Sequence, residues 1–147
     1  MDVPEVLRGL VIGLHHVAIA TPDLAASREL YVGMLGMSPA QEESELVATQ
    51  GVNVFVVHAG TQRVELVEPT GPDSPVAKFI AKRGAGIHHL AWEVADLEAA
   101  LVVLKQQGVR LIHESPQPGA HGTQIAFLHP AATGGVLMEL VQDPAAH

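Results

Sequence analysis

The chain has 147 residues, which is a single-domain length with enough residues for a substantial core. Its 48% hydrophobic and 16% charged residues indicate a compact globule rather than a disordered chain. A formal net charge of −8 argues against a nucleic-acid-binding protein, which needs a basic face, and the absence of cysteine excludes disulfides and thiolate chemistry.

The first half of the chain predicts a strand, a helix and then further strands. Leu14–Ala20 is rich in apolar and β-branched residues and stops at a Thr-Pro pair, as a strand does before a turn. Pro22–Met37 has apolar residues at helical spacing, with Gly36 at its end. One or two short strands are expected in Glu45–Val57, and another in Arg63–Val67.

The second half repeats this order after a linker helix expected at about 74–83, with Ser74 as its N-cap and Pro75 in its first position. Asp96 caps a second amphipathic helix that ends at Gly108. The strands expected in this half are Ile87–Val94, Val109–His113, Thr123–Leu128 and Gly135–Val141.

The chain contains an internal duplication. Gly13–Ala20 reappears as Gly86–Glu93, so that His16 and His89 stand 73 residues apart, and an Asp-Leu pair follows both segments. Each half later carries one glutamate in an apolar run, Glu65 and then Glu139, 74 residues apart. We therefore expect an α+β fold: one domain (1–147) of two βαβββ modules, about 12–70 and 86–142, whose curved sheet has a metal site in a central cleft.

Strand alternation selects the metal ligands. His16 and His89 share a strand face with small alanines, whereas their apolar neighbours face the other way. A carboxylate in an apolar run is costly unless it is paired, and a cation would remove that cost for Glu65 and Glu139. Two imidazoles and two carboxylates without sulfur suit one divalent ion such as Co, Ni, Mn, Fe or Zn, with octahedral coordination completed by other oxygens.

The remaining histidines have simpler interpretations. His15 and His88 lie on the faces assigned to the helices, so we expect them to pack there or to support the ligands from outside. His58, His113 and His147 lack a duplicated carboxylate partner and are interpreted as structural residues.

Such a centre is suited to proton transfer beside a carbonyl. The metal would polarise a substrate oxygen and stabilise an enolate, and a glutamate would act as general base. With Glu65 and Glu139 on opposite sides of a planar intermediate, one removes a proton and the other returns one to the opposite face. This geometry inverts a stereocentre, or isomerises a substrate when two carbons are involved.

The motifs resemble those of the vicinal-oxygen-chelate (glyoxalase/bleomycin-resistance) superfamily and, within it, the methylmalonyl-CoA epimerase family. The resemblance covers about residues 12–142 and implies that superfamily's fold. It also implies an enzyme that interconverts the 2R and 2S epimers of an acyl-CoA substrate, methylmalonyl-CoA. The metal ligands that it implies are His16, Glu65, His89 and Glu139. Cobalt and a homodimer are implied by kinship alone. The segments that carry the resemblance are His15–Ala20, Val64–Pro69, Asp73–Phe79, Gly86–Ala91, Gly119–Gly122, Phe127–Pro130 and Gly134–Leu140.

The sequence departs from the family at two positions. Val54 stands where some epimerases have a second glutamate base, and Glu65 stands where some relatives have glutamine. We therefore expect Glu65 and Glu139 to be the two bases. Glutamates at both metal positions also match glyoxalase I-type lactoylglutathione lyases, so lactoylglutathione lyase activity is the alternative function. Non-catalytic binding of a small molecule is a further alternative.

The sequence contains no signal for a membrane or for secretion. No apolar run reaches the roughly 18 residues of a membrane span. Met1–Leu10 contains two acidic residues and lacks the basic and apolar segments of a secretory signal. We therefore expect a cytoplasmic protein without nucleic-acid or membrane partners.

Overall fold

The computed structural model describes residues 5–145. Helix α1 (Leu24–Arg28) continues into the π-helical segment η2 (Glu29–Met34) and is followed by α2 (Pro75–Arg83) and α3 (Leu97–Gln106). Single 3-10 turns are η1 (Glu5–Leu7), η3 (Ala48–Gln50), η4 (Ala120–Gly122) and η5 (Pro130–Ala132). The strands are β1 (Val11–Ala20), β2 (Ser38–Pro39), β3 (Glu45–Val47), β4 (Val52–Ala59), β5 (Gln62–Pro69), β6 (Gly86–Val94), β7 (Gln117–Pro118), β8 (Gln124–Leu128) and β9 (Met138–Gln142).

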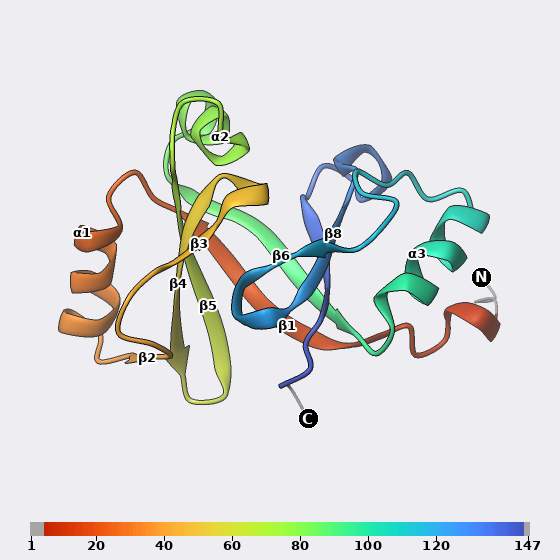
Figure 1. The fold of residues 1–147 in the computed structure, drawn as a ribbon, viewed down its shortest axis with the longest axis horizontal. Helices are drawn as coiled ribbons and strands as arrows, with labels where there is room; N and C mark the ends of the chain where they lie inside the picture. The colour runs from red at the N-terminus through yellow and green to blue at the C-terminus, as the bar shows by residue number, and fades with distance from the viewer. Residues whose placement is uncertain (1–4, 146–147) are drawn as a thin grey trace. The chain divides into compact units, whose positions relative to one another are not determined.

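These strands form a mixed sheet in the order β2-β4-β5-β1-β6-β9-β8-β7, with β3 paired to β4 (Figure 1). The parallel pairs are β1 with β5 and β6 with β9, and each glutamate-bearing strand also pairs antiparallel with the strand before it. The two halves of the sequence therefore repeat one pairing scheme.

The chain divides into two compact units. One unit is His16–His89, and the other contains the residues up to His15 together with those from Leu90 onward. Strands β1 and β6 each cross this division, so each contributes residues to both units. The modules expected from the duplication, about 12–70 and 86–142, stay a prediction.

In the unit His16–His89, α1 and η2 cover one face of the sheet. Phe55, Val57 and Leu66 are almost fully buried there, and Ile19 and Tyr31 pack against them. Figure 1 shows α1 beside β4 and β5, with α2 near the upper end of these strands. Because Leu66 of β5 faces the helix, strand alternation turns its neighbours in β5 toward the opposite face.

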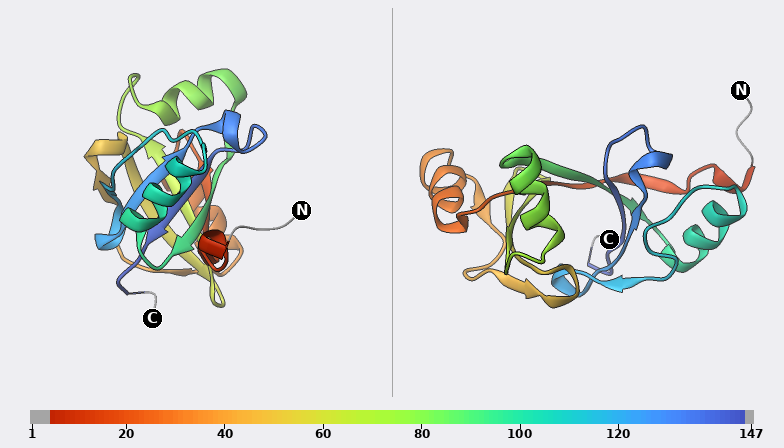
Figure 2. Two further views of the ribbon diagram at one scale, coloured as in Figure 1. Left: turned by 90° about the vertical axis from the view of Figure 1, so that its right-hand side faces the viewer. Right: turned by 90° about the horizontal axis from the view of Figure 1, so that it is seen from above.

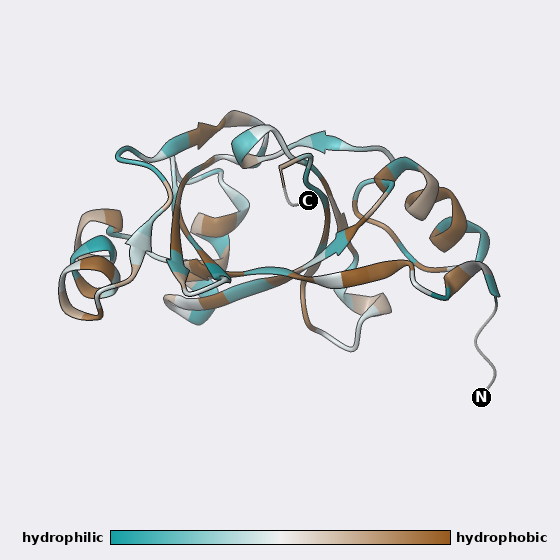
Figure 3. Ribbon diagram, turned by 90° about the horizontal axis from the view of Figure 1, so that it is seen from below, coloured by the Kyte–Doolittle hydropathy of each residue, from teal (hydrophilic) through white to brown (hydrophobic). Residues whose placement is uncertain are grey.

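In the other unit, α3 covers the corresponding face. Leu97 and Leu101 are buried against Ala126 and Leu140. Figure 2 shows α3 beside the strands β8 and β9. In Figure 3 its turns alternate between hydrophobic and hydrophilic colours, as expected for an amphipathic helix. A second apolar cluster lies on the opposite face and contains Ala91, Ile125, Phe127 and Val141.

The first turns of α1 and α3 are held by the same pair of contacts, an aspartate N-cap and a side chain on a neighbouring strand. Asp23 is the N-cap of α1, and the carboxylate of Glu68, on β5, accepts a hydrogen bond of 2.8 Å from the backbone N–H of Leu24. At the start of α3, Asp96 is the N-cap, and Oε1 of Gln142, on β9, accepts a hydrogen bond of 2.8 Å from the backbone N–H of Leu97. The duplication therefore extends to the ends of the helices.

Most of the predicted elements are confirmed, including α2 with Ser74 as N-cap and Pro75 in its first turn. The helix predicted for Pro22–Met37 is shorter, from residue 24 to residue 34, because Asp23 is extended and caps it. At its other end the backbone N–H of Leu35 bonds the carbonyl of Leu30, five residues back, which widens the last turn.

The strand predicted for Val109–His113 is wrong. The N–H groups of Ile112 and His113 both donate to the carbonyl of Phe127, at 2.9 and 3.3 Å, so this segment makes one isolated bridge instead of a ladder. Strand β7 pairs with β8 instead, and its Pro118 suits an edge position because proline has no N–H to donate. None of the described helices is long and apolar enough to cross a membrane.

Candidate metal centre

Each of the two duplicated histidines stands two residues before an alanine that pairs with a glutamate. In the β1–β5 ladder, Ala18 pairs with Glu65, and His16 precedes it by two residues. In the β6–β9 ladder, Ala91 pairs with Glu139, and His89 precedes it by two residues. Residues two apart in a strand share a face. Each ladder therefore presents one imidazole and one carboxylate on the same side of the sheet.

The imidazoles of His16 and His89 approach each other through their Nε2 atoms, which are the ring nitrogens farther from the backbone. Nε2 of His16 lies 3.3 Å from Nε2 of His89, and the rings meet edge to face at 71°. Both residues are buried, at 3% and 6% exposure. Two nitrogens that each lie about 2.1 Å from one ion at a right angle are separated by about 3.0 Å, so the observed spacing fits adjacent coordination positions.

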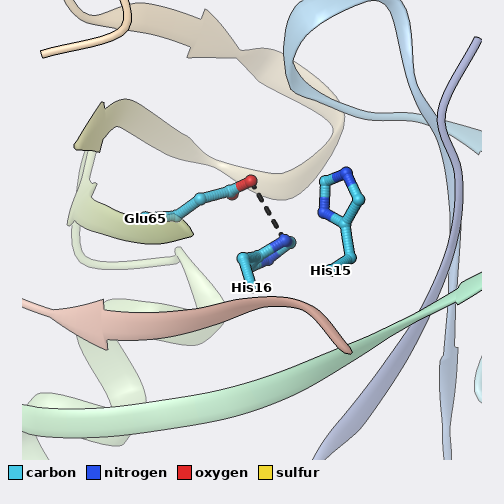
Figure 4. Close-up of side chains that lie close together, drawn as sticks. All are labelled: His15, His16 and Glu65. Atoms are coloured by element: carbon cyan, nitrogen blue, oxygen red, sulfur yellow. Dashed lines mark ion pairs between the residues drawn. The ribbon is translucent and has the colours of Figure 1, made fainter. Parts of the chain in front are cut away.

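Glu65 approaches His16 from β5. Its Oε2 atom lies 3.2 Å from Nδ1 of His16, and its side chain is 13% exposed. Figure 4 shows the carboxylate directed at the His16 ring, with the ion pair drawn as a dashed line. The contacted nitrogen is the one on the other side of the ring from His89. The His16 ring therefore lies between the Glu65 carboxylate and the His89 ring.

His89 also has a neighbour at its inner nitrogen. Nδ1 of His88 lies 2.8 Å from Nδ1 of His89. The His88 ring in turn meets Phe79 of α2 edge to face, with 4.8 Å between the ring centroids. His88 is thus a supporting neighbour of the ligand candidate, which is one of the two roles expected for it.

Glu139 lies in the other compact unit, in the middle of β9. It is 5% exposed, and its strand neighbours in the sheet are Ala91 and Phe127, both of which belong to the apolar cluster on that face. Its charge acts on the nearby imidazole of His113, so this buried carboxylate has a histidine close to it in the same unit.

Of the four predicted ligands, three lie close together in one unit. His16 contacts both Glu65 and His89 there. Glu139 occupies in its own ladder the position that Glu65 has in the first. The donor set of imidazole nitrogens and carboxylate oxygens suits a divalent ion of the first transition series.

His15 is held by a residue that sequence reasoning missed. Its Nε2 lies 2.7 Å from Oδ2 of Asp143, with both side chains buried, at 4% and 7% exposure. The duplication provides no signal for Asp143, because the position 74 residues earlier is Pro69. His15 therefore makes a buried bond from β1 to the residue that follows β9, and its expected role beside the helices or the ligands stays a prediction.

The structural interpretation is supported by a hydrogen bond for His113 and stays a prediction for His58. Nδ1 of His113 accepts a hydrogen bond of 3.0 Å from the backbone N–H of Phe127. Burial lowers the pKa of His113, and the nearby charge of Glu139 opposes that change. His58 is half-buried on β4, opposite Ser38 and Arg63 in the two neighbouring strands. His147 lies outside the described residues.

Comparison with known proteins gives a consistent family. Residues 15–127 match the model of the Glyoxalase/Bleomycin resistance protein/Dioxygenase superfamily. The chain is 42% identical to the mitochondrial methylmalonyl-CoA epimerase of Bos taurus, over 88% of this chain and 73% of that protein. It is 41% identical to the ethylmalonyl-CoA/methylmalonyl-CoA epimerase of Cereibacter sphaeroides, over 88% of this chain and 96% of that one.

A solved structure shows the same relation. A variant of Streptomyces coelicolor methylmalonyl-CoA epimerase, in complex with 2-nitronate-propionyl-CoA, superposes with a TM-score of 0.87 at 35% identity. The match covers 93% of this chain and 98% of that chain. A relative that binds an acyl-CoA thus shares nearly the whole fold.

Proposed function

The chain belongs to the methylmalonyl-CoA epimerase family of the glyoxalase/bleomycin resistance protein/dioxygenase superfamily, and from this premise we propose how it acts. It is an isomerase with the α+β fold of that superfamily. Its substrate is methylmalonyl-CoA, whose 2R and 2S epimers it interconverts by removing the α-proton and returning one to the opposite face. Its metal ligands are His16, Glu65, His89 and Glu139.

The observation that carries this proposal is the matched register of the two ladders, in which each histidine precedes by two residues the alanine that pairs with a glutamate. The side chains of Ala18 and Ala91 are fully buried and small, so they leave space beside the ligands. When bound, the metal ion supplies positive charge that stabilises a carbanion beside a carbonyl. Cobalt is the proposed ion, and the donor set also accepts nickel, manganese, iron or zinc.

Glu65 and Glu139 are the proposed bases. In one direction, the carboxylate of one glutamate takes the α-proton as the C–H bond breaks, and the protonated carboxyl of the other donates its proton to the opposite face of the same carbon. The two groups exchange protonation states in each turnover, so the reverse reaction uses the same pair. General base catalysis of this kind contributes roughly 10²–10⁴-fold to the rate.

Glu65 must satisfy two demands. Its carboxylate contacts Nδ1 of His16, whereas His89 faces Nε2 of the same ring. If these three side chains held one ion, the Glu65 carboxylate would leave Nδ1 of His16, or the His16 ring would turn. A glutamate that exchanges partners in this way is suited to alternate between holding His16 or the ion and accepting a proton.

The decisive experiment is hydrogen exchange at the α-carbon. The cobalt-loaded protein and (2R)-methylmalonyl-CoA are incubated in deuterated water, and proton NMR follows the α-proton signal and the collapse of the methyl doublet to a singlet. We expect exchange with the cobalt-loaded protein and none after chelation. Absence of exchange with stoichiometric cobalt bound would refute the proposal.

Two further substrates, assayed alongside methylmalonyl-CoA, test which reaction the protein prefers. The hemithioacetal of methylglyoxal and glutathione tests the lactoylglutathione lyase alternative, and faster conversion of that substrate would replace the proposed function. Ethylmalonyl-CoA tests tolerance of a larger branch, since the Cereibacter sphaeroides relative is named for both acyl-CoA substrates. Elemental analysis of the purified protein identifies the ion.

The proposal includes a homodimer. It is supported by exposed apolar side chains at the start of β1, where Val11, Ile12 and Leu14 are 44%, 47% and 52% exposed. The cytoplasmic location stays a prediction, because the relatives include both mitochondrial and bacterial proteins.

A further inference from the structure

We infer that His88 is a positioning residue that orients His89 for metal binding through a hydrogen bond between their Nδ1 atoms. This inference rests on the proposed function, since it assigns an outer partner to one of the proposed ligands. The two nitrogens are 2.8 Å apart, which is the distance of a good hydrogen bond.

When Nε2 of His89 binds a metal, the proton of this bond must lie on the His89 side. A neutral imidazole carries one proton, and only its bare nitrogen can bind a metal. Nε2 of His89 faces Nε2 of His16 at 3.3 Å, so Nε2 is the nitrogen that must be bare for coordination. The proton then belongs on Nδ1, and Nδ1 of His88 is placed to accept it. Metal-binding histidines commonly donate their second N–H to a fixed acceptor in this way.

The acceptor is itself held in place. The His88 ring meets Phe79 edge to face on one side, with centroids 4.8 Å apart and planes at 81°. It meets the His89 ring on the other side, at 5.1 Å and 75°. The guanidinium of Arg83 lies 6.0 Å from the centre of the Phe79 ring and extends the stack along α2. Helix α2 therefore fixes the angle at which Nδ1 of His88 meets His89.

The duplicated residue in the first half has a different partner. His15, which corresponds to His88, bonds the carboxylate of Asp143. Nδ1 of His16 is contacted instead by Glu65. The two ligand candidates thus have different groups at their inner nitrogens, a carboxylate for His16 and an imidazole for His89, although the sequence around them is duplicated.

Two substitutions separate the hydrogen bond from ring packing. His88→Phe keeps an aromatic ring against Phe79 and removes the acceptor, whereas His88→Asn keeps an acceptor oxygen near the position of Nδ1. His58→Phe is the matched control, because it changes another half-buried strand histidine on β4. Calorimetric titration with Co²⁺ at about pH 8, above the ordinary imidazole pKa of about 6.5, measures affinity. The visible absorption of the bound cobalt reports its coordination, and thermal unfolding confirms that each variant folds.

We expect His88→Phe to bind Co²⁺ about 10–100-fold more weakly and to change the visible spectrum, because outer partners of ligands have effects of this size. His88→Asn should stay within about three-fold of the unchanged protein, since it restores the acceptor. His58→Phe should not differ from the unchanged protein. Equal Co²⁺ affinity for His88→Phe and the unchanged protein, or equal loss in His88→Phe and His88→Asn, would overturn the inference.

A measurement on the zinc-loaded protein separates this inference from the proposed function, because Zn²⁺ is diamagnetic and allows NMR of the ligands. Long-range proton–nitrogen NMR at about pH 8 identifies which nitrogen of His89 carries the proton. We expect the proton on Nδ1 in the unchanged protein and in His88→Asn, with slow exchange of this N–H with water, and faster exchange in His88→Phe. A proton on Nε2 of His89, or equally fast exchange in the unchanged protein and in His88→Phe, would overturn the role of His88 even though Zn²⁺ is bound. Failure of the unchanged protein to bind Co²⁺ would instead refute the proposed metal centre.

Discussion

Replacing Glu139 with glutamine should separate metal binding from folding. The side chain is 5% exposed, its sheet neighbours are apolar, and a neutral amide of the same shape fits the same space. The metal-free variant should therefore fold with little change in its free energy of unfolding. Loss of a charged ligand should weaken Co²⁺ binding by at least about 100-fold, the upper end of what loss of an outer partner costs.

The expected difference in stability follows from the thermodynamic linkage between Co²⁺ binding and folding. At a free Co²⁺ concentration 100 times the dissociation constant, binding stabilises the unchanged protein by about 2.7 kcal/mol, and a variant with 100-fold weaker binding gains only about 0.4 kcal/mol. At roughly 3 °C per kcal/mol for a chain of this length, the Tm should rise by about 8 °C in the first case and by about 1 °C in the second. Differential scanning calorimetry with and without Co²⁺ measures both shifts. An equal rise in the two proteins would refute Glu139 as a ligand, and a metal-free variant destabilised by several kcal/mol would refute the argument from burial.

Three further predictions test other parts of the structure. His16→Ala and His89→Ala should abolish α-proton exchange while His58→Ala should keep it, and similar exchange rates in all three would contradict the ligand assignment. Leu101→Ala, at a side chain 2% exposed under α3, should lower the free energy of unfolding in urea by about 2–5 kcal/mol; a loss well below this range would mean that the α3 face is loosely packed. Burial lowers the pKa of His113 below its ordinary value of 6.5, so the unfolded state binds more protons and stability falls as the pH drops below that value. His113→Gln should reduce this fall in urea unfolding between pH 6.5 and about pH 5, and an identical fall in both proteins would argue against it.

The candidate ligands could be selected from the sequence because the chain contains an internal duplication. His16 and Glu65 each have a counterpart in the second half, and strand alternation places each histidine on the face of its paired glutamate. The start of α3 was equally predictable, because Asp96 is a local cap whose effect depends on the next three residues. The first helix was predicted to begin at Pro22, before its cap at Asp23.

Features that depend on contacts through space could not be predicted. Asp143 bonds a residue 128 positions away, and its duplicated counterpart is a proline. The segment Val109–His113 has the composition of a strand, but its bonding depends on whether the facing strand offers free carbonyls. The contacts at Nδ1 of His16 and His89 depend on ring orientation, which strand periodicity does not determine.

Strands β1 and β6 each belong partly to one compact unit and partly to the other. A half-length chain carrying a single copy of the duplicated segment would therefore complete neither unit. It would need a second molecule to donate the missing strand, as in a domain-swapped pair. Fusion of two such copies into one polypeptide makes that exchange intramolecular and removes its dependence on protein concentration.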